Sequence, residues 1–266
     1  MNEIREFRRP LARYIGIDTY EHFQERLFRH ALDRYQELCG AGGLGSVAVT
    51  CGMVVDAVQV TRYPFDEILI TGLGDQRQAI LDAVGHDPRI RYQEENAESL
   101  TLDDASFDLV FCKFGLHHLA RPTLGVYEML RCCRRATVFI EPYDSPARRL
   151  LERVQVASVY ERKKRNPGRR DNYVYPFSRR QLINLLNSYY LDSGYRLELH
   201  YGWYSDRSTW RLPRPLRPLS AYAGWLLQYA PGAAGNLLTA LICPGTDRPR
   251  PIFRLGVGHS YTDLGL

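Results

Sequence analysis

Ser46-Val47-Ala48-Val49-Thr50-Cys51-Gly52 is an apolar run that ends in a turn signal, and it opens the part of the chain that decides the fold. Similar short apolar runs follow at 67–72, 106–111 and 136–142, with helix-length segments between them. This alternation predicts βα units around a buried parallel sheet. Such sheets bind ligands beyond the carboxyl ends of their strands, so we look for function in the segments that directly follow each run.

The pattern along the chain predicts one α/β domain over residues 1–266. We expect strands at 46–50, 67–71, 89–93, 107–112, 136–140 and 195–204, and a last strand at either 236–243 or 252–257. Helices are expected after Gly52 and at 20–38, 75–84, 122–134, 147–165, 179–188 and 219–229, with Ser178 as an N-cap. We divide the domain into N-terminal helices (1–40), a core half (41–145), a lid made of insertions (146–235) and a C-terminal strand and tail (236–266).

Charge and cysteine usage limit the kinds of protein this chain can be. Its 266 residues include 35 Lys and Arg against 30 Asp and Glu, which gives a net charge of +5 and a pI of about 8.9. This mild excess fits an anionic substrate or an acidic partner and does not by itself indicate nucleic acid. The six cysteines form no CxxC pair and no signal peptide precedes them, so we expect reduced thiols in a cytoplasmic protein. No apolar run reaches the length of a membrane span.

Residues 40–45, Gly-Ala-Gly-Gly-Leu-Gly, match the GxGxxG pattern of dinucleotide-binding loops. The phosphate-binding version needs these glycines after a strand and at the start of a helix. Here they follow the predicted helix at 20–38 and precede the strand at 46–50. We therefore interpret them as a helix stop and a loop.

Several short segments together resemble the class I S-adenosylmethionine (SAM)-dependent methyltransferase superfamily in order and spacing. They are Asn96-Ala97-Glu98-Ser99-Leu100, Ser106-Phe107-Asp108-Leu109-Val110, Leu116-His117-His118-Leu119, Glu128-Met129-Leu130-Arg131 and Glu141-Pro142. The resemblance covers 46–142, a little over a third of the chain. It implies a three-layer Rossmann-like α/β sandwich with a seven-stranded, mostly parallel sheet and helical lid additions.

The chain departs from this family in the loop after the first family strand. There the family has an acid that holds the amino-acid end of SAM, followed by a Gly-x-Gly-x-Gly turn. At the matching positions this chain has Ala48, then Thr50, Gly52 and Val54. β-Branched residues adopt positive φ poorly, and an alanine offers no counter-charge.

The resemblance nevertheless assigns candidate positions for SAM. They are Cys51 and Gly52 in the first loop, Asp75 for the ribose hydroxyls, and Asn96 and Glu98 near the adenine. Asp75 lies one place beyond the usual acid, and Asn96 replaces an aspartate. Because two of the family's three anchors are altered, we expect no cofactor, with SAM binding lost.

Candidate catalytic groups follow the strands at 107–112 and 136–140. Glu141, Tyr143 and Asp144 come after the second of these strands, where a carboxylate in a cleft can act as a general base. His117 and His118 follow the first, where the resemblance implies a substrate-side base. Adjacent histidines lack the i, i+4 spacing of a helical metal pair, so no metal is expected.

Two features of the predicted lid suggest substrate contacts. Tyr173 and Tyr175 alternate on an extended segment and therefore share a face, from which they can orient a substrate or pack in the core. The basic cluster 162–170 is either a solvated surface or a docking face for an acidic carrier protein or anionic substrate. It lacks the interleaved aromatics of single-strand binding, so no nucleic-acid partner is expected.

From these features we expect an enzyme of small-molecule, natural-product biosynthesis. The first hypothesis is a ring closure or elimination without SAM, such as aziridine formation with loss of an anion, since these reactions need only a base, a held geometry and a leaving-group clamp. The alternatives are a SAM-dependent O- or N-methyltransferase and a non-catalytic subunit that binds a small protein partner.

Overall fold

The structure is a computed structural model that describes residues 2–7, 20–153, 160–161, 172–191, 193–202, 215 and 235–245. Its strands are β1 (Glu3–Phe7), β2 (Ser46–Thr50), β3 (Glu67–Gly72), β4 (Ile90–Glu94), β5 (Phe107–Lys113), β6 (Cys133–Pro142), β7 (Tyr160–Glu161), β8 (Asn172–Tyr173), β9 (Tyr195–Gly202) and β10 (Leu237–Pro244). Its helices are α1 (Tyr20–Cys39), α2 (Val54–Val60), α3 (Arg77–Val84), the short 3-10 turn η1 (Leu116–His118), α4 (Pro122–Cys132), α5 (Pro146–Arg153) and α6 (Arg179–Tyr190).

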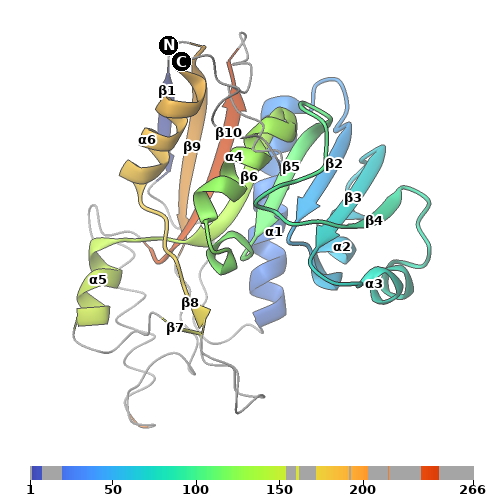
Figure 1. The fold of residues 1–266 in the computed structure, drawn as a ribbon, viewed down its shortest axis with the longest axis horizontal. Helices are drawn as coiled ribbons and strands as arrows, with labels where there is room; N and C mark the ends of the chain where they lie inside the picture. The colour runs from blue at the N-terminus through green and yellow to red at the C-terminus, as the bar shows by residue number, and fades with distance from the viewer. Residues whose placement is uncertain are drawn as a thin grey trace, which may run out of the picture.

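Within the described residues, the main sheet has eight strands in the order β1-β9-β10-β6-β5-β2-β3-β4 (Figure 1). β10 runs antiparallel to both β6 and β9, and the other neighbouring pairs are parallel. The predicted Rossmann-like fold is therefore confirmed, and its strand count of seven is one too low. The additional strand is β1, because residues 1–18 looked basic and mixed and showed no strand pattern.

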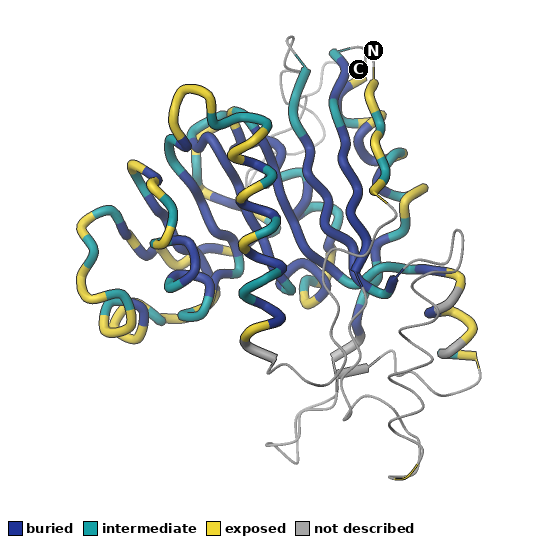
Figure 2. Tube along the Cα trace, turned by 180° about the vertical axis from the view of Figure 1, so that it is seen from behind, coloured by how far each residue is buried: buried dark blue, intermediate teal, exposed yellow. Residues whose placement is uncertain are grey.

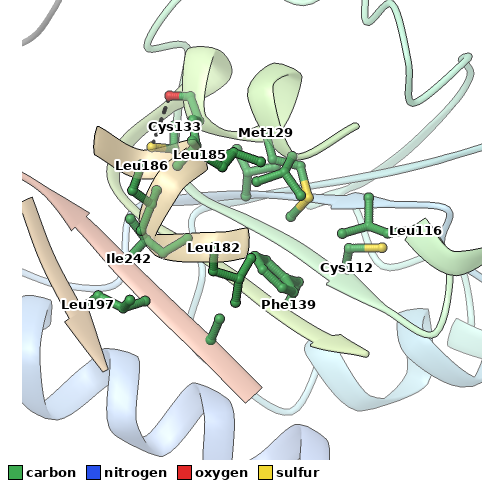
Figure 3. Packing of buried hydrophobic residues seen from close by; sticks show 14 of the residues in the cluster. Cys112, Leu116, Met129, Cys133, Phe139, Leu182, Leu185, Leu186, Leu197 and Ile242 are labelled. Carbon is green, nitrogen blue, oxygen red and sulfur yellow. Dashed lines mark hydrogen bonds between the residues drawn. The ribbon is translucent and has the colours of Figure 1, made fainter. Parts of the chain in front are cut away.

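The central strands are buried on both faces, as Figure 2 shows by their continuous dark blue colour. One hydrophobic cluster packs α1, α2 and α3 against one face of the sheet. A second cluster packs α4, α6 and η1 against the other face, with Met129, Phe139 and Leu182 among its members (Figure 3). Helices on both faces explain why the strands read as apolar runs and not as alternating patterns.

The GxGxxG segment forms a helix end and loop, as predicted. Gly40 N donates to the Gln36 carbonyl at the end of α1, and Gly43 and Gly45 have positive φ angles of 94° and 68°. The sequence pattern in α1 was also read correctly, since its apolar stripe, including Phe23, Leu27 and Tyr35, is buried. These glycines therefore connect α1 to β2.

The second half of the chain confirms some predicted elements and corrects one. Ser178 caps α6 through its hydroxyl, which accepts from Gln181 N, and β10 confirms a strand at 236–243, whereas the alternative at 252–257 lies outside the described residues. The helix predicted at 147–165 is confirmed as far as Arg153 and is wrong at residues 160–161, which pair with β8 as a strand. Leu150 on α5 is 59% exposed. The helix predicted at 219–229 and the basic cluster 162–170 lie outside the described residues.

Candidate active site

A cavity of about 300 Å³ lies where the strand order changes direction, between β2 and β5. Its lining includes Cys51 and Met53, which follow β2, and Lys113 and Phe114 at the end of β5. Pro142 at the end of β6 and Gln24 on α1 complete this side of the lining. An open parallel sheet binds its ligand at such a switch point, and the volume is within the ~300–1,000 Å³ common for small-molecule sites.

The loop after β2 makes its turn without the family's glycines. Cys51 has a φ of 53°, in the left-handed region, and Gly52 N donates to the Thr71 carbonyl at 2.7 Å. A Cβ on Gly52 would lie 2.7 Å from Ile70, so the one retained glycine is required by close packing. The left-handed conformation at Cys51 costs on the order of 1 kcal/mol, which a folded protein can accommodate at a functional loop.

Thr50 and Val54, which stand at two of the family's glycine positions, both pack within the protein. The Thr50 hydroxyl donates to the Phe111 carbonyl of β5 at 3.3 Å, and its side chain is fully buried. Val54 packs against the first hydrophobic cluster. Neither residue is in the cavity lining, because both side chains turn toward the protein interior.

His117 and Glu141 form a buried hydrogen-bonded pair beside the cavity. His117 Nδ1 lies 2.5 Å from Glu141 Oε2, and the two side chains are only 2% and 0% exposed. Glu141 Oε1 also accepts the backbone N–H groups of Gly115 and Leu116 at 2.9 and 2.8 Å, so one carboxylate fixes the whole turn. An ionised carboxylate accepts a hydrogen bond from Nδ1–H, which leaves Nε2 as the basic nitrogen of the imidazole.

His117 and His118 both line the cavity, and the centroids of their rings lie 4.0 Å apart. The structure thus brings together three of the predicted catalytic residues, with Glu141 orienting His117 from behind. His118 follows directly on the same turn and is an exposed residue, whereas His117 is buried. The arrangement resembles the base-and-orienter half of a catalytic triad.

A second buried polar group in the cavity was missed by sequence analysis. Asp56 on α2 and Lys113 on β5 form an ion pair with a separation of 2.8 Å, and both side chains are 3% exposed. Lys113 Nζ also donates to Gln24 Oε1 of α1 at 2.7 Å. All three residues line the cavity. The available signal was a lysine at the end of an otherwise apolar strand, because such a charge needs a buried partner.

The remaining predicted cofactor positions lie on the loops after β3 and β4, outside the cavity lining. Asp75 Oδ1 accepts from Arg77 N at 2.9 Å, at the start of α3. Asn96 Oδ1 accepts from Glu98 N at 3.0 Å, and Glu98 accepts from the backbone and side chain of Arg121. The Glu98 carboxylate therefore joins two loops.

Three other predicted catalytic residues are not in the cavity lining. Asp144 makes a two-pronged ion pair with Arg149, at 2.7 and 2.6 Å. The Tyr143 ring packs 4.8 Å from Tyr201, and burial raises the pKa of Tyr143. The Tyr175 hydroxyl accepts from Gln181 on α6.

The third tyrosine predicted for the site is Tyr173. Its backbone pairs with Tyr160 in the small β7–β8 sheet. Its side chain lies outside the described residues.

In the described parts of the chain, every helix is too short or too polar to cross a lipid bilayer. The same residues contain no group of three or more His, Cys, Asp or Glu side chains placed to hold a metal ion.

Comparisons with known proteins agree on the fold. Residues 41–140 match the family model described as "Methyltransferase domain". The YcgJ protein of Bacillus subtilis has a TM-score of 0.53 and 15% identity, and the match covers 84% of this chain and all of that one. The [4+2]-cyclase SpnF has a TM-score of 0.52 and 18% identity, over 91% of this chain and 88% of that one.

A third solved structure is magnesium protoporphyrin IX methyltransferase (ChlM) from Synechocystis PCC 6803 with bound S-adenosylhomocysteine (SAH). Its TM-score is 0.51 at 11% identity, and the match covers 86% of this chain and 89% of that one. No curated protein sequence matches the chain.

These findings contradict the expectation that the protein has no cofactor. The family match spans the first loop and the switch point, and the fold is shared with a methyltransferase that holds SAH. The expectation gave too much weight to missing glycines, whereas Cys51 takes the required turn and Thr50 faces away from the cavity. The chain thus has the α/β fold of the class I SAM-dependent methyltransferases, and its residues 41–140 match the methyltransferase domain model.

Proposed function

We propose that the protein is a SAM-dependent methyltransferase that acts on a small molecule, with SAM in the cavity between β2 and β5. The observation that carries this proposal is the His117–Glu141 pair at the carboxyl end of the sheet. His117 lines the cavity, and Glu141 is hydrogen-bonded to it from outside the lining. Bound SAM would supply an electrophilic methyl group. The acceptor must then lose a proton, and an imidazole oriented by a carboxylate is suited to take it.

The residues around the cavity fit SAM in size and polarity. Met53 lines the cavity and is 58% exposed, and Leu73, which follows β3 outside the lining, is 70% exposed; both offer an apolar surface to a flat nucleobase at this edge of the sheet. A Cβ at Gly72 would meet only the Gly52 carbonyl at 3.4 Å and the Tyr92 hydroxyl at 3.7 Å, so a ligand has room to approach the backbone there. Asp75 lies on the same edge of the sheet. Large exposed apolar side chains beside a cavity favour a ligand-binding role over chance exposure.

Glu141 has a positioning role in this proposal, and His117 has the catalytic role. Glu141 is fully buried and already accepts two backbone N–H groups. Its carboxylate therefore stabilises the turn at Gly115–His117 and holds the His117 ring in one tautomer. His118 lines the same wall and helps to shape the acceptor side.

The test is a transfer assay with methyl-labelled SAM and a panel of phenols, amines and carboxylic acids. We expect SAH to accumulate in step with a methylated product, and His117→Gln to lower the rate by about 100-fold or more. The variant should bind SAH as tightly as the wild type. Equal turnover by wild type and variant would contradict the role of His117.

A second candidate is a ring closure in the same cavity, supported by the shared fold with the [4+2]-cyclase SpnF. In this reaction His117 again removes a proton, and the cavity holds the substrate in a closing geometry. The same assay distinguishes the two functions. Methylation forms one SAH per product, whereas cyclisation forms product with the SAM concentration unchanged.

A further inference from the structure

We propose that Asp56 and Lys113 together bind the amino-acid end of SAM, in place of the acid that the family has at the position of Ala48. This inference rests on the proposed function, since it assigns residues to the same ligand. Ala48 is fully buried inside the sheet and offers no charge. The Asp56–Lys113 pair is instead the buried pair of charges in the cavity lining.

Each member of the pair retains capacity for a ligand. A lysine ammonium has three N–H donors, and the described residues supply two acceptors, Asp56 and Gln24. Asp56 Oδ2 accepts from Met53 N at 3.0 Å at the start of α2. Its Oδ1 is buried and lies 2.8 Å from Lys113 Nζ. A carboxylate oxygen has two lone pairs, so after this contact Asp56 Oδ1 can accept once more and Lys113 can donate once more at the cavity wall.

The charges of the pair are complementary to those of an α-amino acid. The ligand's carboxylate can accept from Lys113, and its ammonium can donate to Asp56, so four charges alternate in sign. Interactions of this kind are strong in a buried site, because little water screens them. The nearby Phe28 ring, 5.9 Å from Nζ, further limits access of water to the ammonium.

A purely structural role explains the location of the pair less well. A buried ion pair gives little net stability over apolar side chains of the same size, since desolvation offsets most of the attraction. A cavity wall is also a place where the protein could have used apolar residues, as it did with Val55 and Leu237. A polar ligand in the cavity accounts for a charged pair at this position.

The experiment compares two ligands by isothermal titration. SAH has the amino-acid end, whereas 5′-methylthioadenosine is the same nucleoside without it. We expect the wild type to bind SAH about 10- to 100-fold more tightly than 5′-methylthioadenosine. The double variant Asp56→Asn/Lys113→Met should bind the two ligands equally. It removes both charges together, and the Asn side chain keeps an acceptor for Met53 N, so neither partner is left as an unpaired buried charge.

The matched control is Glu67→Gln/Arg91→Met, which neutralises an exposed acid–base pair at the amino ends of β3 and β4. It should retain the wild-type preference for SAH.

Three outcomes separate this inference from the function on which it rests. If the wild type binds both ligands equally, or if the double variant keeps the preference for SAH, the inference is overturned and the function stands. If the wild type binds neither ligand, the proposed function fails. If free amino acids bind the SAH-saturated wild type but not the double variant, the pair belongs to the acceptor substrate, and the inference is overturned.

Discussion

At the scale of single residues, the hydrogen bond between Glu141 and His117 sets the chemistry of the site. We predict that Glu141→Gln inverts the tautomer of His117, because the Gln amide donates to Nδ1 while its carbonyl can still accept from Gly115 and Leu116. Nitrogen-15 NMR of the histidine side chains measures this change. The inverted tautomer places a proton on Nε2 and should lower turnover by about 100-fold or more.

Asn187→Asp is the control for this variant, because it also exchanges an amide and a carboxylate but lies far from the cavity on α6. An unchanged His117 tautomer in Glu141→Gln would show that Glu141 does not orient the ring.

The expectation of a lost SAM site depended on the missing glycines of the loop after β2. It assumed that only glycine would adopt the positive φ angle of that turn. Cys51 adopts a φ of 53° without being glycine. We predict that Cys51→Val lowers the midpoint of thermal unfolding by several degrees relative to Cys51→Ser, since a β-branched residue is strained at positive φ. Equal midpoints for the two variants would show that the loop does not need this conformation.

At the scale of secondary structure, the cap of α6 can be tested separately. Ser178→Ala removes the hydroxyl that accepts from Gln181 N, so we predict a loss of about 1 kcal/mol in the free energy of unfolding. Urea denaturation measures the loss. Ser188→Ala, at an exposed site in the interior of the same helix, should be neutral or slightly stabilising. Equal losses in both variants would contradict the cap.

Sequence analysis predicted most elements between α1 and β6, because long apolar runs in a two-sided sheet leave a strong signal. The capping box at Ser178 was equally readable, since its chemistry is local. The strand β1 was not, because a short edge strand whose exposed residues are Glu3, Arg5 and Phe7 resembles a loop. The helix predicted at 147–165 was wrong at residues 160–161, because their pairing with β8 depends on a contact between distant segments that the local pattern does not record.

At the scale of the whole molecule, topology decided which predicted site residues meet. Cys51 and His117 lie far apart in the chain but share the cavity, because β2 and β5 are neighbours in the sheet. Asp144 follows β6 but pairs with Arg149 on α5, which no strand pattern could reveal. Asp56 and Lys113 were missed because a buried ion pair depends on two elements packing together.

A prediction at this scale concerns the pH dependence of stability and the buried His200 on β9. Burial and the neighbouring His30 lower the pKa of His200 to about 4, while Glu198 acts in the opposite direction. His30 and Arg34 face it from α1, Glu198 lies on its own strand, and Phe7 of β1 stacks on its ring. Between pH 6.5 and 4 the unfolded chain therefore binds a proton at this residue that the folded chain does not.

Because the unfolded state holds more protons in this window, the free energy of unfolding falls as the pH is lowered. His200→Phe keeps a flat ring against Phe7. We predict that the free energy of unfolding of this variant falls by on the order of 2 kcal/mol less than that of the wild type between pH 7 and pH 4.5. Urea titrations at pH 7 and pH 4.5 measure it. His22→Gln, at an exposed position on α1, should retain the wild-type slope. If the free energy of unfolding of His200→Phe depends on pH as steeply as that of the wild type, the assignment of this dependence to His200 is contradicted.

The most direct test of the central claim, that SAM occupies the cavity between β2 and β5, is calorimetric titration of the full chain with SAH. We predict a dissociation constant in the micromolar range, and loss of binding in Val55→Trp, which fills the cavity, but not in Val58→Trp, a half-buried position on the same helix outside the lining. Absence of binding to the wild type at 1 mM SAH (about −4 kcal/mol or weaker), or undiminished binding in Val55→Trp, would contradict the account.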